Sequence, residues 1–207
     1  MTRLALLASA ALIAAAPSVA QPQPGTGPVG GTPTRPASRG ESLSAHQFLQ
    51  EIINSDRFQL AAAQLAEQRS NDPHVKQFAQ QVISDHAQVT QQMQSLMQQL
   101  PPGVTAGLSL GQPGASPGQA AQQAEAQSLD QQHGAMLQRL RSAQGAQFNQ
   151  LYAQEMVREH QNAVDRIANY AQQGDNPQLK QYASQLLPTE RQHLQEAQQL
   201  QRQVGQG

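Results

Sequence analysis

The chain has 207 residues, a formal net charge of −1 from 13 basic and 14 acidic side chains, and no cysteine. This charge gives no electrostatic footprint for nucleic acid or anionic lipid, and 3% aromatic residues are too few for base-stacking surfaces. The absence of cysteine excludes a disulfide scaffold, a thiolate metal site and a cysteine-linked lipid anchor.

The first 20 residues have the pattern of a secretory signal peptide. Arg3 precedes an apolar run from Leu4 to Ala16, and Ser18-Val19-Ala20 is a small-residue cleavage motif. The run is shorter than the roughly 20 residues that span a bilayer. We therefore predict cleavage after Ala20 and an exported protein, periplasmic or secreted, without a transmembrane segment.

Residues 21–41 are rich in proline, glycine, threonine and serine and have no periodic apolar pattern. This composition predicts a disordered tether. From residue 42 the pattern becomes helical, so residues 42–207 are predicted to form a single helical domain.

Helical periodicity predicts four long helices in this domain, at about residues 44–70, 73–100, 147–173 and from 177 onwards. Ser44 and Gln47 can form a capping box, and Pro73 and Pro177 occupy first helical positions. No stretch shows strand-like alternation. Ser116-Pro117 is predicted to open an additional helix that continues to about residue 142.

The two helical hairpins share a turn signature. Residues 66–82 align without a gap on residues 170–186, an offset of 104. A long connection lets the second and third helices of a four-helix bundle run parallel, and residues 101–142 provide it. The sequence therefore predicts an all-α four-helix bundle with one additional helix in this connection.

Each long helix carries ionisable residues where its apolar stripe should continue. These residues are Asp56, His86, His160, Glu190 and His193. Burying such groups costs free energy unless they pair or bind a metal. In each hairpin one of them lies 16 residues before the turn residue, Asp72 or Asn176, and one lies 14 residues after it, while His193 lies one turn beyond Glu190. At 1.5 Å per residue the two pairs lie roughly 21–24 Å from the turns, so they should converge in one layer.

Two hypotheses follow for this layer. Glu190 and His193 have the Glu-x-x-His spacing with which di-iron bundles bind metal, and three imidazoles with one or two carboxylates suit one Fe, Mn, Zn or Cu ion. Asp85, at the edge of the stripe, could orient His86. Glu159 is turned about 100° from the stripe. Alternatively, the same groups form a buried hydrogen-bonded network that fixes helix register.

The chain resembles the bacterial exported family known as domain of unknown function 4142, which is classed as ferritin-like. The resemblance covers nearly all of residues 42–200 and rests on Phe78-Ala79, Asp85-His86, Phe148-x3-Tyr152-x3-Met156-Val157-x2-His160 and Pro188-x4-His193-Leu194. It implies a ferritin-like bundle outside the cytoplasm but no agreed activity. Gln59 occupies a position where family members tend to have glutamate, which departs from a complete ferritin-type centre.

The sequence alone favours a non-enzymatic protein of the cell envelope, with an interaction or stress-associated role. Its glutamine-covered helices would contact an unidentified protein partner or a second copy. The alternatives are metal binding or metal-dependent redox chemistry at the five stripe residues, and a purely structural spacer. No catalytic residue is predicted. His46, His74 and His133 are expected to be solvated.

Overall fold

The computed structural model describes residues 44–110, 119 and 129–205, which belong to one structural unit, residues 40–207. Within these ranges every regular element is a helix, so the all-α prediction is confirmed. The helices are α1 (Ala45–Arg69), α2 (Pro73–Met97), α3 (Pro102–Thr105), α5 (Gln131–Ser142), α6 (Gly145–Gln173) and α7 (Pro177–Val204). The predicted signal peptide and tether lie outside the described residues.

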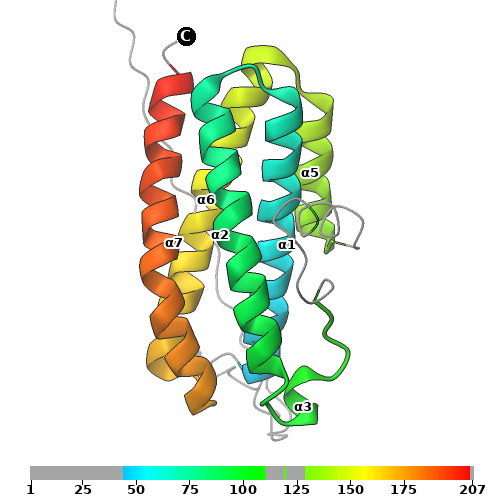
Figure 1. Ribbon diagram of the computed structural model, residues 1–207, viewed down its shortest axis with the longest axis vertical. Helices are drawn as coiled ribbons and strands as arrows, with labels where there is room; N and C mark the ends of the chain where they lie inside the picture. Colours follow the sequence, from blue (N-terminus) through cyan, green and yellow to red (C-terminus); the bar gives the residue numbers. More distant parts are fainter. Residues whose placement is uncertain (1–43, 111–118, 120–128, 206–207) are drawn as a thin grey trace, which may run out of the picture. The chain divides into compact units, whose positions relative to one another are not determined.

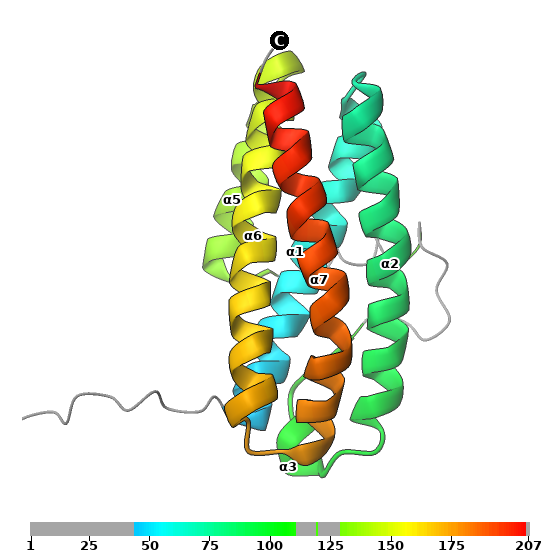
Figure 2. The same ribbon diagram turned by 90° about the vertical axis from the view of Figure 1, so that its left-hand side faces the viewer.

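The four long helices pack as a bundle in which α1 and α7 each contact both α2 and α6 (Figure 1). Helices α1 and α7 run in one direction, and α2 and α6 run in the other. The second and third long helices are therefore parallel, as the long connection predicts. Helix α5, part of that connection, packs outside the bundle on α1 and α6 (Figure 2).

The predicted capping residues start the long helices. The Ser44 hydroxyl accepts from the backbone N–H of Gln47, whose side-chain amide oxygen accepts in return from the backbone N–H of Ser44. Asp72 caps α2 and Asn176 caps α7, each with a side-chain oxygen that accepts backbone N–H groups of the first turn. Because these groups lack partners inside the helix, each cap fixes where its helix begins.

The connection between α2 and α6 differs from the prediction. Helix α2 ends at Met97, before the predicted Leu100, and the short helix α3 was not predicted. Helix α5 begins at Gln131, because the Asp130 side chain accepts from the backbone N–H of His133 and caps a new helix there. The prediction of one helix continuing to residue 142 is therefore wrong at residues 129–130, and its predicted start lies outside the described residues.

A polar layer separates the core into two apolar clusters. One cluster contains the second half of α1, the first half of α2 and α6 and the last turns of α7, together with α5. The other contains the first half of α1, the second half of α2 and α6 and the first turns of α7. The ionisable residues that interrupt the apolar stripes of the long helices lie between these two clusters. In the described residues, no helix is both long and apolar enough to cross a membrane.

Candidate metal centre

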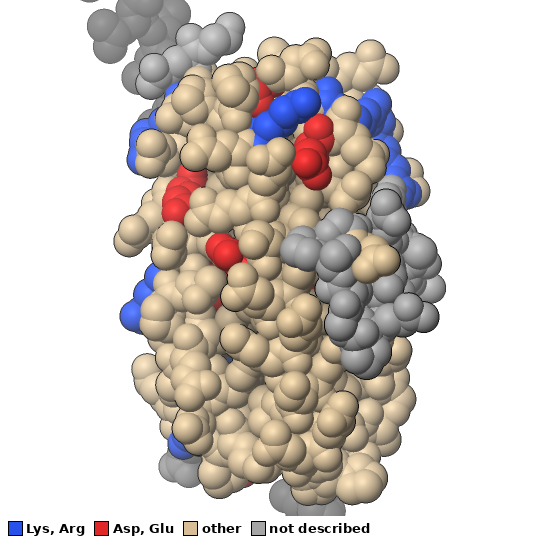
Figure 3. Space-filling model, viewed as in Figure 1, with Lys and Arg blue, Asp and Glu red and all other residues tan. Residues whose placement is uncertain are grey.

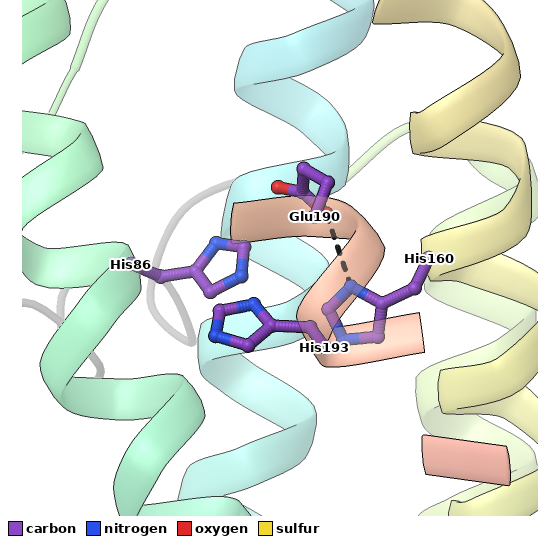
Figure 4. Close-up of side chains that lie close together, drawn as sticks. All are labelled: His86, His160, Glu190 and His193. Carbon is purple, nitrogen blue, oxygen red and sulfur yellow. Dashed lines mark hydrogen bonds and ion pairs between the residues drawn. The ribbon is translucent and has the colours of Figure 1, made fainter. Parts of the chain in front are cut away.

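Four buried side chains from three helices meet in the polar layer. His86 comes from α2, His160 from α6, and Glu190 and His193 from α7 (Figure 4). One nitrogen or oxygen atom of each lies within 4.8 Å of the corresponding atoms of the other three. The exposed fraction of each residue is 4% or less. Four of the five predicted stripe residues therefore form one cluster.

Each imidazole in the cluster is paired with a carboxylate through one ring nitrogen. His86 Nδ1 lies 2.9 Å from Asp56 Oδ1, and His160 Nδ1 lies 3.1 Å from Glu190 Oε2. His193 Nε2 lies 2.9 Å from Asp85 Oδ2. A carboxylate accepts, so each of these nitrogens carries the proton of its ring. In neutral rings the other nitrogens are then unprotonated and can bind a metal.

Those other nitrogens are His86 Nε2, His160 Nε2 and His193 Nδ1. All three are buried and make no hydrogen bond within the described residues. The three rings turn toward one another (Figure 4), and their centroids are 5.2–5.9 Å apart. The cluster thus brings together three imidazoles, from three helices, and each keeps one ring nitrogen that makes no hydrogen bond in the described residues.

The two hairpins contribute to the layer at equivalent positions, but the positions of the imidazole and the carboxylate are exchanged between them. Asp56 pairs with His86, and His160 pairs with Glu190, each across 30 residues of sequence. The offset of 104 places His160 at the position of Asp56 and Glu190 at that of His86. Each hairpin therefore contributes one imidazole–carboxylate pair, and α7 adds His193 one turn beyond Glu190.

Asp56 and Asp85 take places that differ from the sequence interpretation. Asp56, expected among the ligands, accepts hydrogen bonds from His86 and from the Thr90 hydroxyl and is not in the group of four. Asp85, expected to orient His86, instead pairs with His193. Adjacent residues of a helix point about 100° apart, so Asp85 reaches α7 while His86 enters the core.

The carboxylates make the layer favourable for positive charge. Burial opposes protonation of His86, but its hydrogen bond to Asp56 and the charges of Glu190, Asp56 and Asp85 outweigh this effect and raise its pKa. For Glu190, burial opposes ionisation, yet the hydrogen bond from His160 and the neighbouring imidazoles lower its pKa to about 2. Burial and positive charge on His86 and His160 lower the pKa of His193. The same field would stabilise a bound cation.

The donor set fits a single metal ion. Tetrahedral sites hold their nitrogen ligands about 2.0–2.1 Å from the metal, which places the ligands roughly 3.4 Å from one another. One ligand atom of each of the four side chains lies within 4.8 Å of those of the other three, so small side-chain rotations would bring the four side chains onto one ion. Histidines that bind metals usually donate their other N–H to a carboxylate or carbonyl, and all three do so here.

A second polar cluster, between α1, α5 and α6, was missed by the sequence analysis. Glu159, 1% exposed, accepts from the Ser55 hydroxyl at 2.6 Å and lies 3.3 Å from His133 Nε2. His133 Nδ1 contacts Asp130 at 2.5 Å, so the expectation that His133 is solvated is wrong. Gln59 donates to Ser55 in this cluster. The sequence feature that could have predicted this cluster is Glu159, a carboxylate directly before His160 that is buried on α6.

The other two histidines lie apart from both clusters. His46 is half-buried, and its Nδ1 lies 3.0 Å from the carbonyl oxygen of Val104 in α3. His74 is exposed in the first turn of α2, as expected.

Comparisons with known proteins agree with this fold. The family model described as "Domain of unknown function (DUF4142)" matches residues 31–200. The solved structure of "CopM in the Cu(II)-bound form" is similar with a TM-score of 0.57 and 18% sequence identity, and the match covers 79% of this chain and 99% of that chain. At this identity the similarity shows a shared fold. A search of curated proteins finds no match.

Proposed function

The chain belongs to the DUF4142 family, a domain of unknown function, and we propose that it binds one transition-metal ion in the polar layer of its bundle. The ligands would be His86 Nε2, His160 Nε2 and His193 Nδ1, with Glu190 as a fourth. The observation that carries the proposal is a buried group of three imidazoles and one carboxylate whose ligand atoms lie within 4.8 Å of one another, with one nitrogen on each ring that makes no hydrogen bond in the described residues.

These nitrogens support a metal site over a hydrogen-bonded network. A network that fixed helix register would satisfy both nitrogens of each ring, because an unsatisfied buried acceptor costs about 1–3 kcal/mol. Here each ring is satisfied on its carboxylate side alone. A cation at the centre would remove this cost for all three rings. The geometry therefore favours the metal-binding alternative over the purely structural one.

Copper(II) is the proposed ion, with zinc(II) second. Neutral imidazoles suit both ions, and affinity rises along the divalent series to a maximum at copper. The structurally similar CopM is itself described in a Cu(II)-bound form. Three carboxylates next to the imidazoles would offset the charge of a divalent ion. The bound metal would supply Lewis acidity, or electron exchange in the case of copper, while the chain's own residues hold it away from water.

The proposed role is metal binding without catalysis, in an exported protein of the envelope. The export part rests on the signal-peptide pattern of residues 1–20. The ferritin-like classification implied by the family resemblance is part of the same proposal. An interaction role for the glutamine-covered helices remains a second candidate, favoured by a groove in which 8 of 15 lining residues are glutamine.

The test is elemental mass spectrometry and copper(II) titration of the untagged protein, purified from its export compartment. We expect about one ion per chain and loss of binding in the His86→Ala/His193→Ala variant. His74→Ala is the matched control, because it removes an exposed imidazole outside the layer. Binding of copper and zinc by the double variant as tight as by the unmodified protein would disprove the site.

A further inference from the structure

A groove runs between α2 and α7 and includes Asp85, the hydrogen-bond partner of His193. Its volume is about 930 Å³, and its walls include Asp85, Gln88 and Gln92 of α2 and Gln185 and Thr189 of α7. Asp85 connects the groove to the centre, since it accepts the hydrogen bond of His193 Nε2. The groove therefore reaches the partner of a proposed ligand.

Asp85 differs from the other carboxylates of the layer in its exposure. Its side chain is 33% exposed, whereas those of Asp56 and Glu190 are 4% and 5% exposed. The histidine that it contacts is only 1% exposed. Asp85 is thus the carboxylate of this layer that touches both solvent and a proposed ligand.

Asp85 is also the only acidic or basic residue among the 15 that line the groove. The face shown in Figure 3 has its charged atoms mostly in the upper half, while the lower half is almost free of charge. A single negative charge at one end of a neutral groove focuses the field on cations. Glutamine side chains offer amide oxygens, which are weak ligands that do not retain a metal ion.

From these observations we infer that the metal ion enters and leaves the centre through the α2–α7 groove, with Asp85 receiving it before transfer to His193. This inference rests on the proposed metal-binding function and adds the route of exchange. The ligand is a hydrated divalent cation. No bond other than coordination is made or broken, and the ion exchanges water ligands for the Asp85 carboxylate and then for imidazole nitrogens.

Three other cavities of the described residues lie away from the centre. The cavity beside α5 is lined by Asp130, His133 and Glu159, which belong to the second polar cluster. Two more lie at the α5–α6 turn, and neither is lined by a histidine or by an aspartate or glutamate. The α2–α7 groove alone among these includes a group hydrogen-bonded to a proposed ligand.

The test is stopped-flow measurement of copper(II) and zinc(II) association, and of dissociation into excess chelator, on the full mature chain. Gln88→Trp places a bulky side chain in the groove, three residues from Asp85. A blocked route raises the free-energy barrier to metal exchange without changing the free energy of the metal-free or the metal-bound protein. We expect association and dissociation rate constants to fall together by about tenfold, with Kd changed by less than about twofold.

Gln161→Trp is the matched control, since Gln161 is also an exposed glutamine close in sequence to a site histidine but does not line the groove. It should leave both rates unchanged. Gln88→Lys and Gln88→Glu provide a second test that does not depend on a bulky residue. The lysine should slow association and the glutamate should accelerate it, and both effects should decrease as salt is added.

The outcomes separate the two proposals. If the unmodified protein binds neither copper nor zinc, the metal-binding function and the route both fail. If it binds metal but the tryptophan and both charge variants of Gln88 exchange at the unmodified rate, the route is wrong and the site stands. Equal slowing by Gln161→Trp would also overturn the route, because blocking would then not depend on the groove.

Discussion

His193 donates a hydrogen bond from Nε2 to Asp85 Oδ2 at 2.9 Å, and this contact joins α7 to α2. It leaves Nδ1 of the same ring facing the centre without a hydrogen bond in the described residues. A carboxylate that is one-third exposed thereby fixes which nitrogen of a buried ring is available. The proposed metal centre depends on this choice as much as on the presence of the histidine.

Asp85→Ala is therefore expected to weaken metal binding about 10- to 100-fold, as removal of such outer partners commonly does. The metal-free protein should lose little stability, because the aspartate is one-third exposed. Competition titration with a chelator of known affinity gives the ratio of Kd values. Asp165→Ala, at an exposed position of α6, is the control. An unchanged Kd for Asp85→Ala would show that the contact does not support a ligand.

His160→Ala should abolish the rise in melting temperature that metal produces. Binding to the folded state alone adds about 4 kcal/mol of stability at a ligand concentration 1,000 times Kd, or roughly 10 °C for a domain of this size. The variant loses a proposed ligand and the hydrogen bond to Glu190. Calorimetry with and without copper separates the two effects. A metal-dependent rise equal to that of the unmodified protein would exclude His160 as a ligand.

The second polar cluster should make stability depend on pH. Burial opposes protonation of His133, but its hydrogen bonds to Glu159 and Asp130 outweigh this and raise its pKa above 6.5. The pKa values of Glu159 and Asp130 are lowered from 4.5 and 3.8 because the same contacts outweigh their burial. The histidine contribution is complete below pH 6.5 and is lost as the pH rises through its folded-state pKa. The carboxylate contributions are present above their ordinary pKa values and are lost as the pH falls through the folded ones.

His133→Leu should accordingly destabilise the metal-free protein most at about pH 5.5, by about 1–3 kcal/mol, because Glu159 then loses a buried partner. The difference from the unmodified protein should shrink by about pH 9. Urea denaturation at both pH values measures it. His74→Leu should show no such dependence, and a pH-independent loss in His133→Leu would mean that only packing against Phe58 is affected.

The two helix caps should contribute independently of the centre. Asp72→Ala and Asn176→Ala each remove a side-chain acceptor for the first turn of a helix. Each should lower the free energy of unfolding by about 1 kcal/mol, and the double variant by their sum, because the turns lie at opposite ends of the bundle. Denaturation of the metal-free protein measures these values. A change in copper affinity in either variant would contradict this independence.

The sequence by itself determined the four long helices, their parallel middle pair and the level at which the polar residues meet. Caps, prolines and apolar spacing act over a few residues, and a constant rise and turn per residue then fix height and face. The same arithmetic placed His86, His160, Glu190 and His193 in one layer.

Only the tertiary structure decided which groups pair within that layer and which residues lie buried beside it. The partner of Asp85 depends on how α2 and α7 are rotated against each other, and the burial of His133 depends on where α5 packs. Both depend on side-chain contacts between segments distant in sequence, for which no local spacing rule exists. The three free imidazole nitrogens, on which the proposed function rests, emerge at this level.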